Sequence, residues 1–501
     1  MLLLVVLAAA APLVVKAVGV SGPGVPHPGA VTLGQPSGPS TAHPFGVDEL
    51  GRDVFARVVF GTRTALFDGV LGALIAALAG GLLGLAAARL GRWARGATLL
   101  VAEALTAFPV VLLGLAVGAS CDAGGCAAGA ISPGIATVVF VVALCGFGPV
   151  ARAAARGPSW RSPAVVALRF VPAAILLDAA LGFLGAGVRG STADWGQMLA
   201  GAQHAIANGE SAWWLLLFPG AALLITVIAW RVLASAFCER AAPSEPPGVV
   251  DVLAPLPLIA GIAFVLFSVL PERSGSSMFH HSPLGAIGSH LAGTVSVIAG
   301  PVVLWLVLGP VLSVAAARRR GRPLRAAAFL LSSAPVFLLG TVAVWLFASD
   351  VGKLAVLPGV GRYVGLTADP GKWVGSLALP WIALGLWWVA SGMVALSSDA
   401  QRVLDAGFVR LARAKGLSAA RVFWRHVVRA MASVSAGRLA RDLGVLLGGV
   451  LLTEVVFKLG GVGLLAYDAA RLGAVATAQW VAVLAAALIV VVRALRWGIR
   501  R

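Results

Sequence analysis

Long apolar runs recur along the whole chain, separated by shorter stretches that hold most of its charged residues. Each run is about 20 residues long, which as an α-helix spans the roughly 30 Å hydrocarbon core of a membrane. A backbone inside lipid must form its hydrogen bonds internally, and the runs lack the short alternation typical of membrane β-strands. The pattern predicts an all-α polytopic membrane protein with about twelve spans, centred near residues 10, 75, 108, 141, 175, 224, 261, 303, 337, 387, 446 and 486.

Composition and charge support this class. The chain has 501 residues, of which 59% are hydrophobic and 12% charged, so one soluble core could not bury its apolar surface. With a cytoplasmic N-terminus, most of the 38 Lys and Arg residues fall in inner segments, and the positive-inside rule predicts that both termini are cytoplasmic. This topology, and contact of arginines with anionic membrane lipids, explain the net charge of +18. We therefore expect no nucleic-acid partner.

Two short patterns occur twice in the chain, at similar places within their spans. The stretch PVVLLG at 109–114 recurs as PVFLLG at 335–340, an offset of 226 residues. An acid followed by two glycines at the same spacing recurs with an offset of 276 residues, as Asp178, Gly185 and Gly187 and then as Glu454, Gly461 and Gly463. These repeats predict two parallel six-helix halves, 1–240 and 252–501, joined by a cytoplasmic linker at 241–251. The second half holds 50 more residues between its third and fifth spans.

Part of this excess is the basic stretch DAGFVRLARAKGLSAARVFWRHVVRA at 405–430, inside a predicted cytoplasmic loop at 398–432. Apolar side chains fall on one face at Phe408, Leu411 and Ala412, and a second apolar stripe begins at Val422, Phe423 and Val427. Between them Gly416 permits a turn and Ser418 can cap the second helix. We expect a helical elbow that inserts apolar side chains into a partner's groove while its arginines hold the rim. A solvated basic loop attracted to lipid is the alternative, and spans on both sides disfavour a DNA-binding motif.

The chain resembles ABC importer permeases of the dipeptide/oligopeptide/nickel family over nearly its full length. The first half resembles the C-type permease in HPFGVDELGRDVFARVVFGTR (43–63), FPVVLLGLAV, ILLDAALGFLGAGV, DWGQML and WWLLLFPG. The second half resembles the B-type permease in VRLARAKGLSAARVFWRHVVRA, which is similar to the family's coupling loop, and in TEVVFKLGGVG. The resemblance implies that the two permeases are fused in one chain.

The resemblance also implies a function. The chain would form the pathway for peptides or similar small solutes, delivered by an extracytoplasmic binding protein and powered by two separate ATP-binding cassette subunits in the bacterial plasma membrane. No phosphate loop is present, so the chain is not expected to be an enzyme or to hold a cofactor, and ATP and Mg are expected on the partner subunits. The residues expected to couple to an ATPase subunit are Phe408, Arg410, Leu411, Arg413, Ala414, Lys415, Gly416, Leu417, Arg421 and His426.

The first half departs from this pattern in its inner loop. The matching stretch RAAARGPSWR runs only from Arg152 to Arg161, and the next span follows almost at once. No complete elbow fits in so few residues. The sequence therefore predicts one working coupling elbow and one degenerate site.

Two further groups of residues carry candidate roles. Asp178 and Glu454 lie near the outer ends of their spans, where they line the pathway or a gate, or else cap or pair with an adjacent helix. The same alternatives apply to Asp68, with pairing to Arg63 or exposure to water as a further one. An outer-loop motif either contacts the binding protein or forms a salt-bridged plug on a short helix, and the plug is favoured. The motif residues are His43, Gly46, Asp48, Leu50, Gly51, Arg52 and Asp53.

The remaining candidates are weaker. We expect a disulfide between Cys121 and Cys126 in an outer loop, and we read Trp195, Trp213 and Trp214 as membrane-interface anchors. His280, His281 and His290 are read as solvated residues, and no metal site is expected.

Two rival functions stay open. Twelve spans in two parallel halves also describe a secondary transporter, which the elbow and the scarcity of buried charge suitable for proton coupling disfavour. A membrane-embedded enzyme is disfavoured because no HExxH or GxSxG motif occurs.

Overall fold

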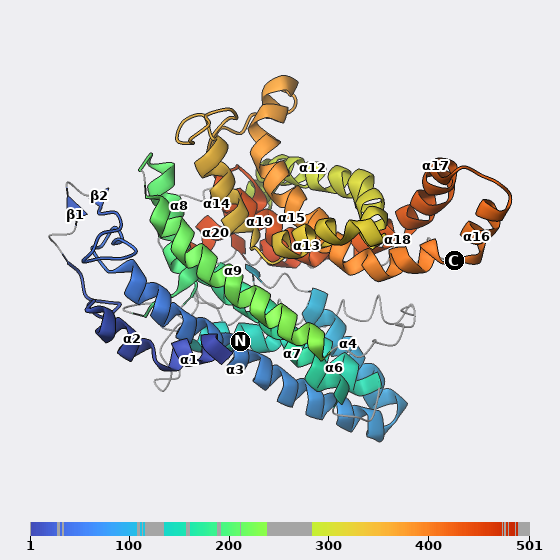
Figure 1. Cartoon of the computed structure of the whole chain (residues 1–501), viewed down its shortest axis with the longest axis horizontal. Helices are drawn as coiled ribbons and strands as arrows, with labels where there is room; N and C mark the ends of the chain where they lie inside the picture. Colours follow the sequence, from blue (N-terminus) through green and yellow to red (C-terminus); the bar gives the residue numbers. More distant parts are fainter. Residues whose placement is uncertain are drawn as a thin grey trace. The chain divides into compact units, whose positions relative to one another are not determined.

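The computed structural model describes residues 2–27, 31–32, 35–107, 111–112, 114–115, 135–156, 161–187, 192–210, 212–237, 283–472, 474, 477–478, 480–485 and 487–488. Helices make up nearly all of the regular structure in these ranges (Figure 1). The strands in the described ranges are an antiparallel pair of two residues each, β1 (Val31–Thr32) and β2 (Gln35–Pro36). The predicted all-α polytopic membrane fold is confirmed.

Contacts group the described helices into two units: the first holds α1 to α9, the start of α12 up to Ser289 and most of α20 from Leu465, and the second holds α12 from His290 to α19 and the first residues of α20 up to Leu464. The helices of the first unit are α1 Leu2–Ala9, α2 Ala11–Val18, α3 Val54–Leu90, α4 Arg92–Ala107, α6 Ile135–Arg156, α7 Arg161–Phe183, α8 Trp195–Ala207 and α9 Trp213–Ala236. Those that follow are α12 Pro283–Ala317, η2 Arg319–Gly321, α13 Arg322–Leu331, α14 Val336–Phe347, α15 Pro370–Leu404, α16 Gly407–Ala414, α17 Ala419–Val422, η3 Phe423–Val428, α18 Arg429–Arg441, α19 Leu443–Phe457 and α20 Val462–Leu472.

Among the described residues, six helices are long and apolar enough to cross a membrane by themselves: α3, α6, α7, α9, α12 and α15. They account for the spans predicted near residues 75, 141, 175, 224, 303 and 387. Two bent pairs bring the number to eight if each pair is one span: α13 with α14, bent by 96°, and α19 with α20, bent by 74°. They lie where spans were predicted near residues 337 and 446.

The number of twelve spans is not confirmed. Near residue 10 the chain forms α1 and α2, each eight residues long, whereas a membrane span needs about 20 residues. The span predicted near residue 261 lies outside the described residues, and those near 108 and 486 lie partly outside them. The same holds for the predicted linker at 241–251.

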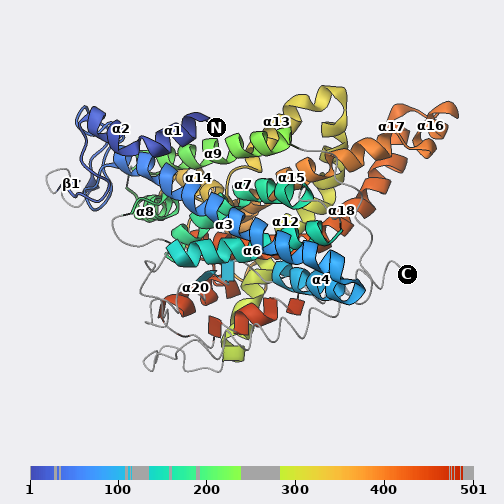
Figure 2. The same ribbon diagram turned by 90° about the horizontal axis from the view of Figure 1, so that it is seen from below.

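Small residues let α3 pack closely in the first unit. A Cβ atom on Gly72 would lie 2.3 Å from Cγ1 of Val142, and one on Gly84 would lie 2.5 Å from the carbonyl oxygen of Ala151. Both neighbours belong to α6, which lies alongside α3 in both views (Figures 1 and 2). Lipid tails are as apolar as the side chains, so the hydrophobic effect does not drive helices together inside a membrane. Close van der Waals packing is therefore a main source of helix association there.

In the second unit a buried tryptophan holds α12 to α15 and α18. The Trp305 side chain is 1% exposed, and its ring occupies the space where Gly392 of α15 has no side chain. Its indole N–H donates to the backbone oxygen of Ser435 in α18 at 3.1 Å. α18 is thereby fixed at Ser435 to the long helices. α16 and α17 extend beyond the other helices of their unit (Figures 1 and 2).

Candidate functional site

The elbow, residues 405–430, is built as two short helices at an angle. α16 ends at Ala414, and Gly416 takes a φ of 77°, a left-handed conformation that side chains with a Cβ atom rarely adopt. The Ser418 hydroxyl then accepts a hydrogen bond from the Arg421 N–H at 3.4 Å and caps α17. The π-helical turn η3 follows and leads into α18. The helix, break and helix predicted from the sequence are confirmed.

The elbow turns one face inward and leaves large apolar side chains outside. Val409, Ala412, Val422 and Val427 are 0% to 5% exposed and form its inner face. Three large side chains point outward instead, with exposures of 46% for Phe408, 56% for Leu411 and 60% for Trp424. The predicted grouping of Phe408, Leu411 and Ala412 on one face was wrong for Ala412, which is buried on the inner face with Val409. Trp424 was not predicted to belong to the exposed set.

The same elbow also exposes basic side chains. Arg410, Arg413, Lys415 and Arg421 are exposed, as is Ala414, whereas Leu417 and His426 are half-buried. Within the part of the chain that the structure describes, none of the four exposed basic side chains forms an ion pair. The elbow therefore exposes three large apolar side chains together with basic side chains that have no acidic partner in the described ranges.

A cation–π contact ties the elbow to the end of α12. The Arg318 guanidinium lies over the Phe423 ring, with its Cζ atom 4.7 Å from the ring centroid. Phe423 in turn meets Trp424 edge to face, with ring centroids 5.0 Å apart. The elbow therefore contacts the arginine-rich stretch that begins at Arg318.

The first unit has no room for a second elbow at the matching place. α6 ends at Arg156 and α7 begins at Arg161, which leaves four residues for the connection. Those four residues, 157–160, lie outside the described part of the chain. The elbow of the second unit needs more than twenty residues between α15 and α18.

Glu454 is fully buried and accepts three hydrogen bonds. Its Oε1 atom accepts from the Thr294 hydroxyl at 2.7 Å, and its Oε2 atom accepts from the N–H groups of Gly463 at 2.7 Å and Leu464 at 3.1 Å. The last two N–H groups belong to the first turn of α20, which has no partners within its own helix. The Val462 N–H donates to the Thr294 hydroxyl at 2.7 Å. Glu454 and Thr294 together cap the N-terminus of α20. This agrees with the capping interpretation of Glu454 and not with an open position on a pathway.

Asp178, the counterpart of Glu454, has no such partners. It is 2% exposed, its Oδ1 atom has no hydrogen-bond partner, and Asp194 and Asp68 lie near enough to interact with it electrostatically. Asp68 is 0% exposed and neither of its carboxylate oxygens has a partner. Of the alternatives for Asp68, pairing with Arg63 and exposure to water were wrong, because Asp68 is buried and interacts with the buried acids Asp178 and Asp194.

Asp194 is the third acid of this group and caps α8. Its Oδ1 atom accepts from the Gly196 N–H at 2.8 Å, while Oδ2 has no partner. Burial raises the pKa of Asp194 from 3.8 to about 6, although the hydrogen bond from Gly196 and the charge of Arg57 oppose this rise. We call Asp68, Asp178 and Asp194 the acidic group of the first unit.

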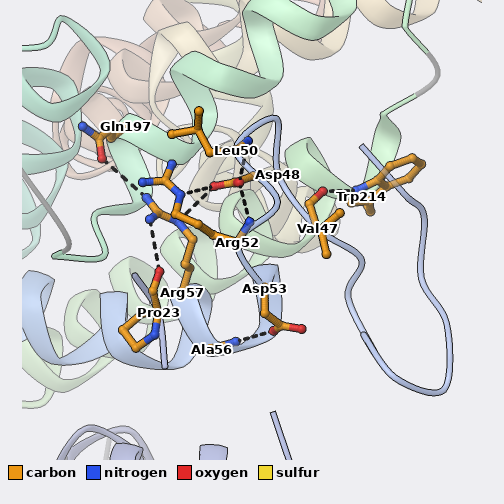
Figure 3. Close-up of polar contacts among 10 residues, drawn as sticks. All are labelled: Pro23, Val47, Asp48, Leu50, Arg52, Asp53, Ala56, Arg57, Gln197 and Trp214. Atoms are coloured by element: carbon orange, nitrogen blue, oxygen red, sulfur yellow. Dashed lines mark hydrogen bonds and ion pairs between the residues drawn. The ribbon is translucent and has the colours of Figure 1, made fainter. Parts of the chain in front are cut away.

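Around the start of α3 the outer-loop motif folds onto Arg57 (Figure 3). The Asp48 carboxylate accepts from the N–H groups of Leu50 and Arg52 at 3.0 and 2.9 Å, and from Arg52 Nε at 2.7 Å. Arg57 is 1% exposed, and its Nε atom lies 3.6 Å from Asp48. Its terminal nitrogens donate to the Pro23 carbonyl and to Gln197, both at 3.4 Å. We call these residues the Arg57 cluster.

The motif pairs its own charges, but it does so in a turn and not on the short helix we expected. Asp53 caps α3 by accepting from the Ala56 N–H at 2.9 Å and also contacts His43 Nδ1 at 2.8 Å. Gly46 and Gly51 have positive φ angles. A Cβ atom on Gly46 would lie 2.8 Å from the Trp214 ring, so this turn requires glycine.

Two tryptophans that were read as membrane-interface anchors belong to the interior. Trp195 is 2% exposed and donates to the Val58 carbonyl at 3.0 Å, and Trp214 is 8% exposed and donates to the Val47 carbonyl at 3.1 Å (Figure 3). Trp213 is 41% exposed. The interface interpretation was therefore wrong for Trp195 and Trp214.

Sequence reasoning missed Arg57, Asp194 and Thr294. Asp194 had a readable signal, because an aspartate directly before a helix is a strong N-cap candidate. Arg57 and Thr294 had none, since their partners lie far away in the chain. Among the described residues no group of three His, Cys, Asp or Glu side chains could hold a metal ion. Cys121, Cys126, His280 and His281 lie outside the described residues.

Comparison with known proteins places these features in one context. Residues 306–496 match the family of binding-protein-dependent transport system inner membrane components. A dipeptide transport system permease protein of Alkalihalophilus pseudofirmus is 29% identical over 226 residues, covering 39% of this chain and 70% of that protein. A peptide transport system permease protein of Brucella suis is 34% identical over 220 residues, covering 39% and 71%. The dipeptide transport system permease protein of Bacillus subtilis is 32% identical over 230 residues, covering 39% and 67%.

Proposed function

The chain belongs to the family of inner-membrane permeases of binding-protein-dependent ABC importers, and we propose that it fuses two such permeases into one complete translocation pathway. The first half, 1–240, supplies the C-type permease and the second, 252–501, the B-type permease, with the linker at 241–251 between them. The two copies of the acid and glycine pattern, and the separate grouping of α1 to α9 and of α12 to α19, support this arrangement.

One observation carries the proposal that separate ATPase subunits drive transport. The elbow exposes Phe408, Leu411 and Trp424 together with basic side chains, although burying one such apolar side chain is worth about 1.5–3 kcal/mol. Large apolar side chains that stay exposed together and are ringed by charge mark an interaction site. The partner would offer an apolar groove with an acidic border, as a cytoplasmic ATP-binding cassette subunit would.

The transported solute follows from the relatives rather than from the pathway itself. The similar proteins are named as dipeptide and peptide transport permeases. We propose peptides or similar small solutes, handed over by an extracytoplasmic binding protein. The Arg57 cluster, which fixes the start of α3 to α8, would give that protein a rigid docking rim, in addition to the self-pairing that the plug interpretation describes.

The stoichiometry of the purified complex tests the fusion. The tagged chain is isolated in mild detergent from its own membranes, and the mass of the complex is determined. We expect one copy of this chain with two cassette subunits. Two copies of the chain in one complex would rule out the fused pathway, and the absence of any cassette subunit would rule out ATP-driven transport by this chain.

The elbow is tested with a matched pair of double variants. Phe408→Ser with Leu411→Ser should remove most of the bound cassette subunit, because it removes the apolar side chains that would enter the groove. Leu354→Ser with Val356→Ser is the control, since those side chains are 60% and 67% exposed in another loop of the same unit. Equal loss of the cassette subunit in both variants would show that the elbow is not the docking element.

A further inference from the structure

A small pocket of about 260 Å³ opens between α13 and α15 of the second unit. Its walls are apolar: α13 contributes Ala326, Ala328 and Phe329, and α15 contributes Met393 and Val394. Ser397 also borders the pocket, but its hydroxyl donates to the Val394 carbonyl of its own helix at 2.9 Å. Arg325 is the charged residue of the lining. The pocket therefore suits an apolar group attached to something negative.

The size of the pocket limits what enters it. Sites for whole small molecules usually measure about 300–1,000 Å³, so this pocket is slightly too small for one. A slender flexible chain needs less width. An acyl chain, of which part remains outside the pocket, fits both the volume and the apolar lining.

The charge near the pocket is mostly positive, because Asp399 of α15, two residues beyond Ser397, is paired with Arg402 at 2.7 Å. Residues 283–349 contain no Asp or Glu, whereas arginines gather just before and within α13. Arg320, Arg322 and Arg325 form no ion pair within the described ranges. Such a cluster attracts anionic lipid headgroups, with each arginine near the surface strengthening the attraction.

The helix that carries these arginines has the form of a surface helix. α13 is bent by 96° away from α14 and does not continue its direction. It begins with exposed Arg322 and ends with Leu330, which is 50% exposed. A short amphipathic helix with arginines at one end and exposed leucine at the other is typical of a segment lying in the membrane interface.

We propose that this pocket binds one acyl chain of an anionic phospholipid, whose phosphate is held by Arg322 and Arg325. The lipid would fasten α13 to α15 from the membrane side. Arg318, a few residues earlier, already stacks on Phe423 of the elbow. A bound lipid would therefore also steady the base of the elbow. The site requires only that the chain lies in a membrane and does not depend on which solute it moves.

Photolabelling of the full-length chain tests the proposal. The chain, reconstituted in nanodiscs, is exposed to phosphatidylglycerol that carries a photoreactive group in its acyl chain, and labelled peptides are mapped by mass spectrometry. We expect label on α13 and α15. Phosphatidylcholine with the same reactive chain should label these peptides far less. Equal labelling by both lipids would overturn the requirement for an anionic headgroup.

Two variants on neighbouring positions separate the pocket from the surface around it. Ala326→Trp should abolish labelling because Ala326 is exposed and lines the pocket, so a large side chain there covers the opening without disturbing the core. Ala327→Trp is the control, since Ala327 is an exposed neighbour that does not line the pocket. Unchanged labelling in Ala326→Trp, or equal loss in both, would overturn the assignment.

A charge variant tests the headgroup. Arg322→Gln with Arg325→Gln should weaken phosphatidylglycerol labelling by roughly 25-fold, because each arginine near an anionic surface contributes a factor of about five. Lys353→Gln, in a loop away from α13, should have no effect. An excess of glycerol phosphate distinguishes lipid from free phosphate: it should not compete with the lipid, and full competition would overturn the lipid assignment in favour of a phosphate site. Melting temperatures confirm that each variant is folded.

Discussion

Asp178 and Glu454 occupy matching positions of the two halves, each followed by glycines at the same spacing, but their surroundings differ. Glu454 accepts from one hydroxyl and two helix N–H groups, whereas Asp178 has an oxygen without a partner and faces two further acids. Thr294 follows Asp68 by 226 residues, the same offset as the PVVLLG repeat. At this position the second half places the Thr294 hydroxyl beside its acid, whereas the first half places a second acid, Asp68. Equal spacing in the sequence has not conserved the same chemistry.

The connections between helices also differ between the two halves. The second half has an elbow between α15 and α18, whereas four residues join α6 to α7 in the first half. The first half therefore holds buried acids with unpartnered oxygens and has no room for an elbow between α6 and α7, while the second has a hydrogen-bonded buried acid and an exposed elbow. We infer that the second half transmits the work of the ATPase subunits.

The largest expected effect comes from distorting the elbow. Gly416→Val places a β-branched side chain at a φ of 77°, a conformation that costs an ordinary residue roughly 1–2 kcal/mol and a β-branched one more. The two short helices would lose their angle, and substrate-stimulated ATP hydrolysis and transport in proteoliposomes with the partner subunits should largely disappear. Gly407→Val is the control, since Gly407 lies on the same elbow in open space without a positive φ. Equal inhibition by both would show that the turn at Gly416 is not what matters.

The next effect tests the two matching acids with isosteric changes. Glu454→Gln replaces one acceptor oxygen by an NH₂ group that faces existing donors, and each buried unsatisfied group costs about 1–3 kcal/mol. Its melting temperature should fall. Asp178→Asn replaces a buried carboxyl group that has an unpartnered oxygen and lies among other acids, so its melting temperature should hold or rise. If Asp178→Asn destabilises the protein as much as Glu454→Gln, the two acids are equivalent after all and the comparison fails.

The elbow shows what could be predicted from the sequence. Its two short helices, its glycine turn and its serine cap are local signals within a few residues, and each was found in the structure. The capping of α20 by Glu454 was only one of two alternatives, because its partner Thr294 lies 160 residues away. Trp195 and Trp214 were misplaced for the same reason, since their carbonyl partners lie 137 and 167 residues away. Local chemistry is readable from one sequence, and long-range pairing is not.

The buried acids also correct an argument against a secondary transporter. We expected little buried charge suitable for proton coupling, yet Asp68, Asp178, Asp194 and Glu454 are all buried. The family match, and not a scarcity of buried charge, separates this chain from ion-driven carriers. The error arose because a carboxylate within an apolar run carries no sign of whether the helix turns it inward.

A smaller effect depends on pH and concerns Asp194. Its folded pKa, raised to about 6, lies above its ordinary value of 3.8, so its contribution to stability is fully present below pH 3.8 and is lost as the pH rises through 6. Asp194→Asn keeps an oxygen to cap α8 but does not ionise. Its melting temperature should therefore exceed that of the wild type above pH 6, and the difference should shrink toward pH 4. Thermal melts in detergent from pH 4 to pH 8 measure this, and a difference that does not change with pH would contradict the assignment.

The smallest effect is expected in the first half, at the connection between α6 and α7. Arg156 ends α6 and Arg161 begins α7, and the four residues between them cannot build the two helices and the turn that the elbow requires. Replacing both arginines by Ala should leave transport and substrate-stimulated ATP hydrolysis close to the wild-type level, apart from a weaker anchoring of positive charge at the membrane surface. The measurement uses the same proteoliposomes as Gly416→Val, so the two variants are compared directly. If the double variant lost as much activity as Gly416→Val, the short connection would itself dock on a cassette subunit, and both halves, not the second alone, would transmit the work of ATP hydrolysis.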